Sequence, residues 1–363
     1  MIVAKKVFKI PSFTLENGTV LRGVELGYET YGQLNAAKTN AVLICHYFSG
    51  TSHAAGRYHE SDPEPGYWHS IIGPGKAIDT DKYFVFSMDV LSNVNTKLPH
   101  VVTTGPATVN PETGRPWGSS FPIVSVGDFV NTQKLLCDML GIQKLHAVAG
   151  PSLGSLQAME WSARFPEFTD RVISAIPASL ATDAYLVAVL NTWGAPIRLD
   201  RHFNDGEYYG QQEPTHGLTE AFKLVTLNAL HHAWAKRLFQ RRWTDTNQNP
   251  IDSLDHTFSI ESTLHETAKG RALQADANSF LRICRAVQMF SVRERKQKIR
   301  ARFLIVEAES DLLMYPAYAE DGARELIELG LQVERFSIKG DGGHLDGLSE
   351  IHQAAEKIRR FLE

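Results

Sequence analysis

The side chain most able to do chemistry is Ser152, in the stretch VAGPSLGSLQAMEW at residues 148–161. Residues 150–154 spell the pattern G-x-S-x-G, which can place a serine on a sharp turn between a strand and a helix. A serine hydroxyl there can attack an acyl carbon if a base takes its proton, an acid orients that base and N–H groups hold the oxyanion. The alternative is that Ser152 only caps the helix that follows.

An acid and a base follow Ser152 at suitable places in the chain. Asp311 comes after the apolar run ARFLIVEAE, and His344 comes after QVERFSI. Ser152 itself comes after LHAVAG, so all three residues follow runs that are typical of buried strands. The order serine, acid, histidine is that of the α/β-hydrolase triad. We therefore predict a nucleophile, an acid and a base at these positions; the alternatives are a turn aspartate and a surface histidine.

Backbone N–H groups are expected to hold the oxyanion. One is the N–H of Leu153, the residue after the nucleophile, and the second comes from the loop HYFSG after the apolar run at residues 41–48. Either Tyr47 or Phe48 could supply the second N–H, and we favour Phe48. Because backbone groups make these bonds, the side chain of Tyr47 is free to line a substrate pocket.

These residues require strands that end at one edge of a sheet. Short apolar runs predict strands at 41–48, 83–91, 145–150 and 171–179, and apolar residues at helical spacing predict a helix at 126–142. Alternation of strands and helices predicts a mostly parallel central sheet with helices on both faces. The expected fold class is therefore α/β, with the α/β-hydrolase fold.

The middle of the chain has a different character. Residues 181–299 show helical patterns, including a long one at 218–243, and no convincing strand. The strand signal then returns at 301–310 and at 332–338. We predict a core in two parts with an inserted all-helical lid: residues 1–180 and 300–363 form the core, and residues 181–299 form the lid.

Composition limits the remaining classes of function. The chain has 363 residues and a formal net charge of −4, so no nucleic-acid partner is expected. No apolar run is long enough for a membrane span. Three widely spaced cysteines and an N-terminus without the apolar run of a signal peptide predict a cytoplasmic protein. No metal-binding or phosphate-binding motif occurs, so neither a metal nor a cofactor is expected.

The sequence resembles the homoserine O-acetyltransferase family of α/β-hydrolase proteins over nearly its whole length. The stretches that carry the resemblance are YETYGQLNAAKTNAVLICH (28–46), GYWHSIIGPGKAIDTDKYFVFSMDVL (66–91), TTGPATVNPETGRPWGSSFP (103–122), GPSLGSLQAMEW (150–161) and DGEYY (205–209). The resemblance implies triad roles for Ser152, Asp311 and His344. It also implies a helical lid and homodimers that pair through it.

Two departures from this family concern the second substrate. Family acetyltransferases have an aspartate after the catalytic histidine, which engages the homoserine ammonium; here Leu345 stands there. They also have an arginine for the homoserine carboxylate, where this chain has Gly194 or Ala195. Arg198 lies about one helical turn further on and Asp346 lies one residue late. The sequence leaves open whether either of them rebuilds a charged acceptor site.

Losing both charges would make an amino acid a poor acceptor, since losing one partner of a buried charged pair costs about 2–5 kcal/mol. Leu345 makes this side apolar, and we expect it to line the substrate pocket together with Tyr47. We predict a serine carboxylesterase for small neutral esters with short acyl groups such as acetyl. The alternative is an O-acyltransferase that moves an acetyl group from acetyl-CoA to homoserine or another alcohol. A non-catalytic binding module is a third, less favoured reading.

Overall fold

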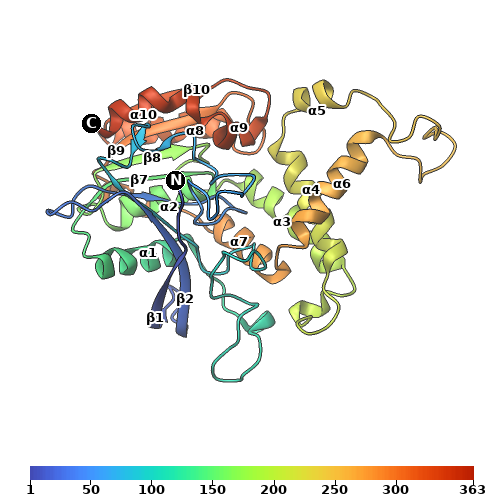
Figure 1. Cartoon of the computed structure of the whole chain (residues 1–363), viewed down its shortest axis with the longest axis horizontal. Helices are drawn as coiled ribbons and strands as arrows, with labels where there is room; N and C mark the ends of the chain where they lie inside the picture. Colours follow the sequence, from blue (N-terminus) through green and yellow to red (C-terminus); the bar gives the residue numbers. More distant parts are fainter.

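The computed structural model describes residues 1–363 and is built on an eight-stranded sheet (Figure 1). The strands are β1 (Lys6–Thr14), β2 (Val20–Tyr31), β3 (Ala41–Ile44), β6 (Phe84–Met88), β7 (Leu145–Pro151), β8 (Arg171–Ala175), β9 (Arg302–Ala308) and β10 (Val333–Ile338). Their order in the sheet is β1-β2-β6-β3-β7-β8-β9-β10. From β6 to β10 in this spatial order, which includes β3, neighbouring strands are parallel. At the other edge β2 pairs antiparallel with β6, and β1 pairs antiparallel with β2.

Each face of this sheet has its own hydrophobic core. Because successive strand residues point to opposite faces, Leu43 of β3 lies in one core and its neighbours Val42 and Ile44 lie in the other. The helices that cover the first face are α1 (Val126–Leu140), α2 (Leu153–Arg164) and α8 (Pro316–Glu328), and α10 (Ala355–Leu362) covers the second. The predicted fold class, a mostly parallel sheet with helices on both faces, is thus confirmed.

The sheet differs from the prediction at its edge and in the length of its strands. Strands β3 and β6 end at Ile44 and Met88, sooner than the apolar runs indicated, because the chain there turns into loops over the sheet. Strand β1 is one that the apolar pattern does not predict. It pairs only with β2 and contains Pro11, which an edge strand tolerates because no second neighbour needs its N–H.

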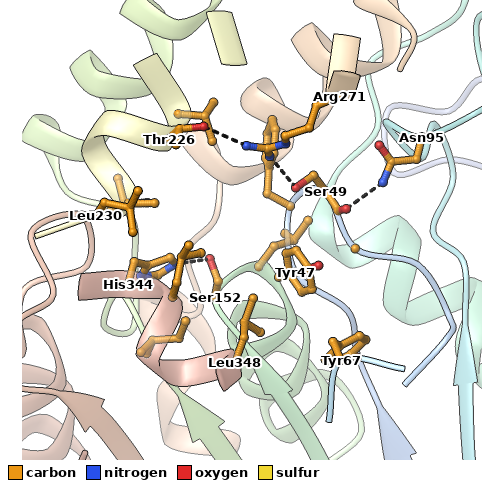
Figure 2. Close-up of a pocket in the computed structure, with 18 of the residues that line it drawn as sticks. Tyr47, Ser49, Tyr67, Asn95, Ser152, Thr226, Leu230, Arg271, His344 and Leu348 are labelled. Atoms are coloured by element: carbon orange, nitrogen blue, oxygen red, sulfur yellow. Dashed lines mark hydrogen bonds between the residues drawn. The ribbon is translucent and has the colours of Figure 1, made fainter. Parts of the chain in front are cut away.

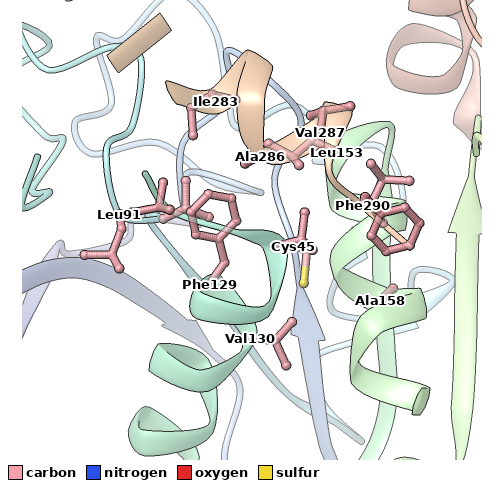
Figure 3. Close-up of a cluster of buried hydrophobic side chains, with 14 of the residues drawn as sticks. Cys45, Leu91, Phe129, Val130, Leu153, Ala158, Ile283, Ala286, Val287 and Phe290 are labelled. Carbon is pink, nitrogen blue, oxygen red and sulfur yellow. The ribbon is translucent and has the colours of Figure 1, made fainter. Parts of the chain in front are cut away.

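Between β8 and β9 the chain forms helices (Figure 1). They are α3 (Ala184–Leu199), α4 (Thr215–Ala229), α5 (His232–Leu238), α6 (Ser259–Ala272) and α7 (Ala277–Gln288), and we call residues 184–288 the helical segment. Helices α3 to α6 stand beside the sheet (Figure 1), and α3, α4, α6 and α7 all contribute buried side chains to the first core. Ile283 and Val287 of α7 lie near Cys45 there (Figure 3). No helix of the chain has the length and apolar character that crossing a membrane requires.

The long helical pattern at residues 218–243 forms two helices in the structure, with a break that the pattern does not mark. Helix α4 ends at Ala229, and Leu230 takes an extended conformation with φ −102° and ψ 142°. His231 then caps α5, since its ring nitrogen accepts the N–H of Ala233 at 3.3 Å. The break carries a functional consequence, because Leu230 and Trp234 come to line the main cavity.

Candidate active site

Ser152 stands on the turn between β7 and α2, with φ 56° and ψ −121°. A positive φ is uncommon for a non-glycine residue, and the turn is held by the N–H of Ser152, which donates to the carbonyl of Ala175 at 3.0 Å. Both glycines of the G-x-S-x-G pattern allow close packing. A Cβ on Gly154 would lie 2.1 Å from the carbonyl oxygen of Cys45, and one on Gly150 would lie 2.6 Å from it. This is the strand-turn-helix setting that the pattern predicts.

The structure brings the three predicted side chains together at the carboxyl edge of the sheet. Nε2 of His344 lies 2.8 Å from Oγ of Ser152 (Figure 2), and Nδ1 lies 2.6 Å from Oδ2 of Asp311. All three side chains are buried, and they follow β7, β9 and β10. Contact from hydroxyl to imidazole to carboxylate is the geometry that serine-based acyl transfer requires.

Asp311 fixes the orientation of the histidine. Its Oδ1 accepts the N–H groups of Leu313 at 2.8 Å and Met314 at 2.9 Å, which leaves Oδ2 for His344. An ionised carboxylate can only accept, so Nδ1 of His344 carries the proton of that bond. Nε2 is then the nitrogen that accepts from the Ser152 hydroxyl, as a general base must.

Neither of the two charged residues that the sequence left open lines the cavity. Asp346 opens the short helix α9 (Asp346–Ser349), and its buried Oδ2 accepts from the hydroxyl of Ser310 at 3.0 Å and from the N–H of Gly342 at 3.1 Å. It therefore holds the turn before His344. Arg198 is exposed on α3, outside the residues that line the cavity.

The predicted oxyanion donors lie on the loop after β3 and at the start of α2. The N–H groups of Tyr47 and Phe48 donate no hydrogen bond within the chain. Leu153 is the first residue of α2, where N–H groups have no partner inside the helix. The ring of Phe48 packs edge-on against Trp193 at 5.6 Å and Phe280 at 5.0 Å, which fixes the loop. Leu153 and Phe48 are our candidates for the oxyanion site.

A cavity of about 750 Å³ is lined by Ser152 and His344 (Figure 2). Of its 33 lining residues 19 are hydrophobic, which is typical of a small-molecule site. Both predicted pocket residues, Tyr47 and Leu345, belong to this lining. Arg271 is the one Lys, Arg, Asp or Glu among them. The cavity therefore has an apolar character with a single permanent charge.

A buried ionic cluster anchors the end of the loop after β3. Nζ of Lys5 lies 2.9 Å from Oε1 of Glu29 and 3.5 Å from Oδ2 of Asp89. The other oxygen of Asp89 accepts the N–H of Ser52 at 2.7 Å, and Oε2 of Glu29 lies 3.0 Å from Nδ1 of His53. The bonds of Ser52 and His53 to these two carboxylates thus tie this loop to β2 and to the chain after β6.

Glu29→Gln tests what this cluster contributes to the fold. Burial acts to raise the pKa of the Glu29 carboxyl, but the bond to His53 and the charge of Lys5 hold that pKa below its ordinary value. Such a carboxylate stabilises the fold above its unfolded pKa of about 4.3 and loses this effect as the pH falls through its folded pKa. We expect the variant to lose about 3 kcal/mol of unfolding free energy at pH 7, and clearly less below about pH 4. Urea denaturation at both pH values measures this.

The matched control is Glu25→Gln on the same strand. Glu25 pairs with Lys9 at the surface, where ion pairs contribute little. Equal losses of stability in the two variants, or a loss at Glu29 that does not depend on pH, would contradict the role given to the buried cluster.

The fold and this site define the class of protein. A model of the alpha/beta hydrolase fold family matches residues 40–350, from just before β3 to beyond His344. The chain therefore belongs to the α/β-hydrolase family.

Within that class, the chain belongs to the homoserine O-acetyltransferase family, as its sequence suggested. It is 38% identical to the homoserine O-acetyltransferase of Desulfotalea psychrophila, with 99% of this chain and 94% of the relative covered. The crystal structure of homoserine O-acetyltransferase from Bacillus anthracis superposes with a TM-score of 0.95 at 34% identity, with 100% of this chain and 98% of that chain covered. The crystal structure of esterase E22 superposes with a TM-score of 0.95 at 42% identity over the whole of both chains. Similar proteins thus carry both names.

Two residues that line the cavity were not predicted from the sequence. Arg271 lies on α6 and Leu230 lies at the break between α4 and α5. The available signal for Arg271 is its spacing from Thr263 and Thr267, which places three polar side chains on one face of α6. No sequence signal marks Leu230, because neither glycine nor proline interrupts the helical pattern there.

Proposed function

We propose that this protein is a serine carboxylesterase that hydrolyses small neutral esters with short acyl groups, acetyl above all. The observation that carries the proposal is the serine, histidine and aspartate set beside a cavity wall without a carboxylate. Leu345 follows His344 directly, lines that wall and is 39% exposed. An apolar wall accepts the alcohol part of a neutral ester and offers no partner to an ammonium group.

In the proposed reaction, Oγ of Ser152 attacks the ester carbonyl carbon while Nε2 of His344 takes the hydroxyl proton. Asp311 stabilises the imidazolium, and the N–H groups of Leu153 and Phe48 hold the oxyanion. The bond from the carbonyl carbon to the alcohol oxygen then breaks, and His344 returns its proton to the departing alcohol. Water attacks the acyl-serine with His344 as base, and the carboxylic acid leaves.

The second candidate is an O-acyltransferase that uses acetyl-CoA and homoserine or another alcohol. The names of the Desulfotalea psychrophila and Bacillus anthracis relatives favour it, whereas the name of esterase E22 favours hydrolysis. Both reactions use the same acyl-enzyme, and they differ in whether water or an alcohol takes the acyl group.

The deciding experiment runs two reactions with the purified protein. One contains acetyl-CoA and homoserine, and the free CoA is followed. The other contains a small neutral acetate ester such as ethyl acetate, and the acetic acid is followed. We expect acetic acid from the ester and no homoserine-dependent release of CoA. Homoserine-dependent release that exceeds ester hydrolysis would replace the esterase with the transferase.

Leu345→Asp is expected to move the protein toward the transferase. The carboxylate would face the cavity next to His344 and could pair with the homoserine ammonium. We expect homoserine-dependent release of CoA to appear in this variant, at about tenfold or more above the rate without homoserine, equivalent to about 1.4 kcal/mol. Leu345→Asn is the matched control, because it has the shape of the aspartate without the charge. If both variants behave alike, the charge at this position does not select the acceptor.

A further inference from the structure

Arg271 faces the cavity without a counterion. Its Nη2 donates to Oγ of Ser49 at 2.9 Å, and its Nη1 donates to Oγ1 of Thr226 at 3.1 Å (Figure 2). Its guanidinium carbon lies 4.3 Å from the ring centre of Phe222. It forms no ion pair, and no aspartate or glutamate lines the cavity. Since a guanidinium offers five N–H groups, most of them have no acceptor in the chain.

A positive charge in this position is costly for the free protein. Burial lowers the pKa of Arg271, and the one opposing contribution comes from the nearby Tyr47. An arginine nevertheless keeps its proton in proteins, so the charge persists. The hydroxyls of Ser49 and Thr226 hold the guanidinium in place without neutralising it. An anionic group on a bound molecule would supply the missing counterion and recover the cost.

The surroundings of Arg271 form a polar wall, which we define as Ser49, Asn95, Thr263, Thr267 and Arg271. Three of these residues follow one another at four-residue spacing on α6 and share a face of the helix. Nδ2 of Asn95 donates to the carbonyl of Ser49 at 2.7 Å (Figure 2). This bond ties the loop after β3, which carries Phe48, to the polar wall.

The opposite side of the cavity, next to His344, is apolar. Its lining includes Leu230, Leu345 and Leu348. Figure 2 shows Leu230 and Leu348 beside His344, and Arg271 at the other end of the drawn site near Ser49. A molecule that fits both walls has a neutral reacting part and one polar end.

We propose that the cavity prefers esters that carry one carboxylate away from the reacting bond, held by Arg271, and no ammonium group. This inference rests on the proposed esterase reaction and refines its substrate class: the part of the molecule around the reacting ester bond stays neutral, as proposed above, but a remote carboxylate is added. A carboxylate matches the planar guanidinium in charge and shape. A phosphate dianion would keep an unmatched charge, because the cavity has no second permanent cation. An amino acid would leave its ammonium without an acidic partner.

The test compares acid esters with neutral counterparts in which the carboxylate is itself esterified. In 4-acetoxybutanoate the carboxylate is on the alcohol side, and its methyl ester is the neutral counterpart. Monoethyl succinate has the carboxylate on the acyl side, with diethyl succinate as its counterpart. O-acetylhomoserine adds an ammonium group to 4-acetoxybutanoate. We expect the acid of one pair to exceed its neutral counterpart in kcat/KM on the order of 10- to 100-fold, mainly through KM. The pair that shows this preference tells whether Arg271 holds a carboxylate on the alcohol side or on the acyl side of the ester.

Variants at Arg271 distinguish binding from a structural role. In Arg271→Gln the ratio of acid to neutral ester should fall to about one or below, and Arg271→Lys should restore part of it. Arg198→Gln is the control, because Arg198 lies outside the cavity, and it should keep the wild-type ratio. A wild-type ratio at or below one for both pairs overturns the inference. So does an equal decline of all esters in Arg271→Gln, which would give Arg271 only a structural role.

Binding separates this inference from the proposed function. Calorimetry with Ser152→Ala measures the affinity for 4-acetoxybutanoate and monoethyl succinate without turnover. Tight binding that Arg271→Gln abolishes supports the carboxylate site even if no ester is hydrolysed, in which case the esterase proposal fails alone. If neutral esters are hydrolysed but neither acid binds more tightly than its neutral counterpart, the carboxylate site fails alone.

Discussion

Ser152→Ala is expected to lower kcat for p-nitrophenyl acetate on the order of 10⁵-fold, or about 7 kcal/mol of activation free energy. The hydroxyl lies 2.8 Å from Nε2 of His344, and no second nucleophile replaces it on the turn after β7. The N–H groups and the cavity persist in the variant, so a small residual rate above that in water should survive. Steady-state assays with pre-steady-state bursts measure both the rate and the acyl-enzyme.

Ser162→Ala is the control for this substitution. Ser162 is a buried serine on α2, the helix that follows Ser152; its hydroxyl donates to the carbonyl of Met159 at 2.7 Å, and it lies outside the cavity lining. The control should keep the burst of p-nitrophenol and a rate close to that of the wild type. If Ser152→Ala keeps the burst as well, then Ser152 is not the nucleophile.

Asp311→Asn should be the second most damaging change, at about 10⁴-fold in kcat. An asparagine can present its amide N–H₂ to Nδ1 of His344, which would then accept instead of donating. The proton would move to Nε2, and this nitrogen could no longer take the proton of Ser152. The effect should appear in kcat, with KM nearly unchanged, because the cavity does not include Asp311.

Asp341→Asn offers a comparison three residues before the histidine. Asp341 is an exposed partner of Arg237, so its loss should leave kcat close to the wild-type value. A similar decline in the two variants would mean that the loop before His344 is sensitive to any change. The specific role of the Asp311 carboxylate would then be rejected.

The serine, acid and histidine could be predicted from the sequence because each follows a strand that a short apolar run marks. In a parallel sheet such runs deliver their next residues to one edge, so the approach of Ser152, Asp311 and His344 needed little further information. The G-x-S-x-G pattern also specifies local geometry, since Gly150 and Gly154 leave no room for a Cβ beside Cys45.

The polar end of the cavity could not be predicted in the same way. Arg271 meets Ser49 across 222 residues of sequence, and this contact depends on how α6 packs against α4 and the loop after β3. The role of Asp346 depends on the direction in which its side chain points, and not on how near it lies to His344 in the sequence. On a helical turn, consecutive residues point about 100° apart, so Leu345 lines the cavity while Asp346 holds the turn before His344.

The position of the helical segment between β8 and β9 has an evolutionary consequence. The proposed nucleophile, acid and base come from the sheet edge, whereas Arg271 and most of the polar wall come from residues 184–288. The proposed carboxylate site is thus encoded largely apart from the proposed reaction centre, whereas Leu345 lies beside His344. Mutations in the helical segment can therefore change which remote group of an ester is held while the reaction centre stays intact.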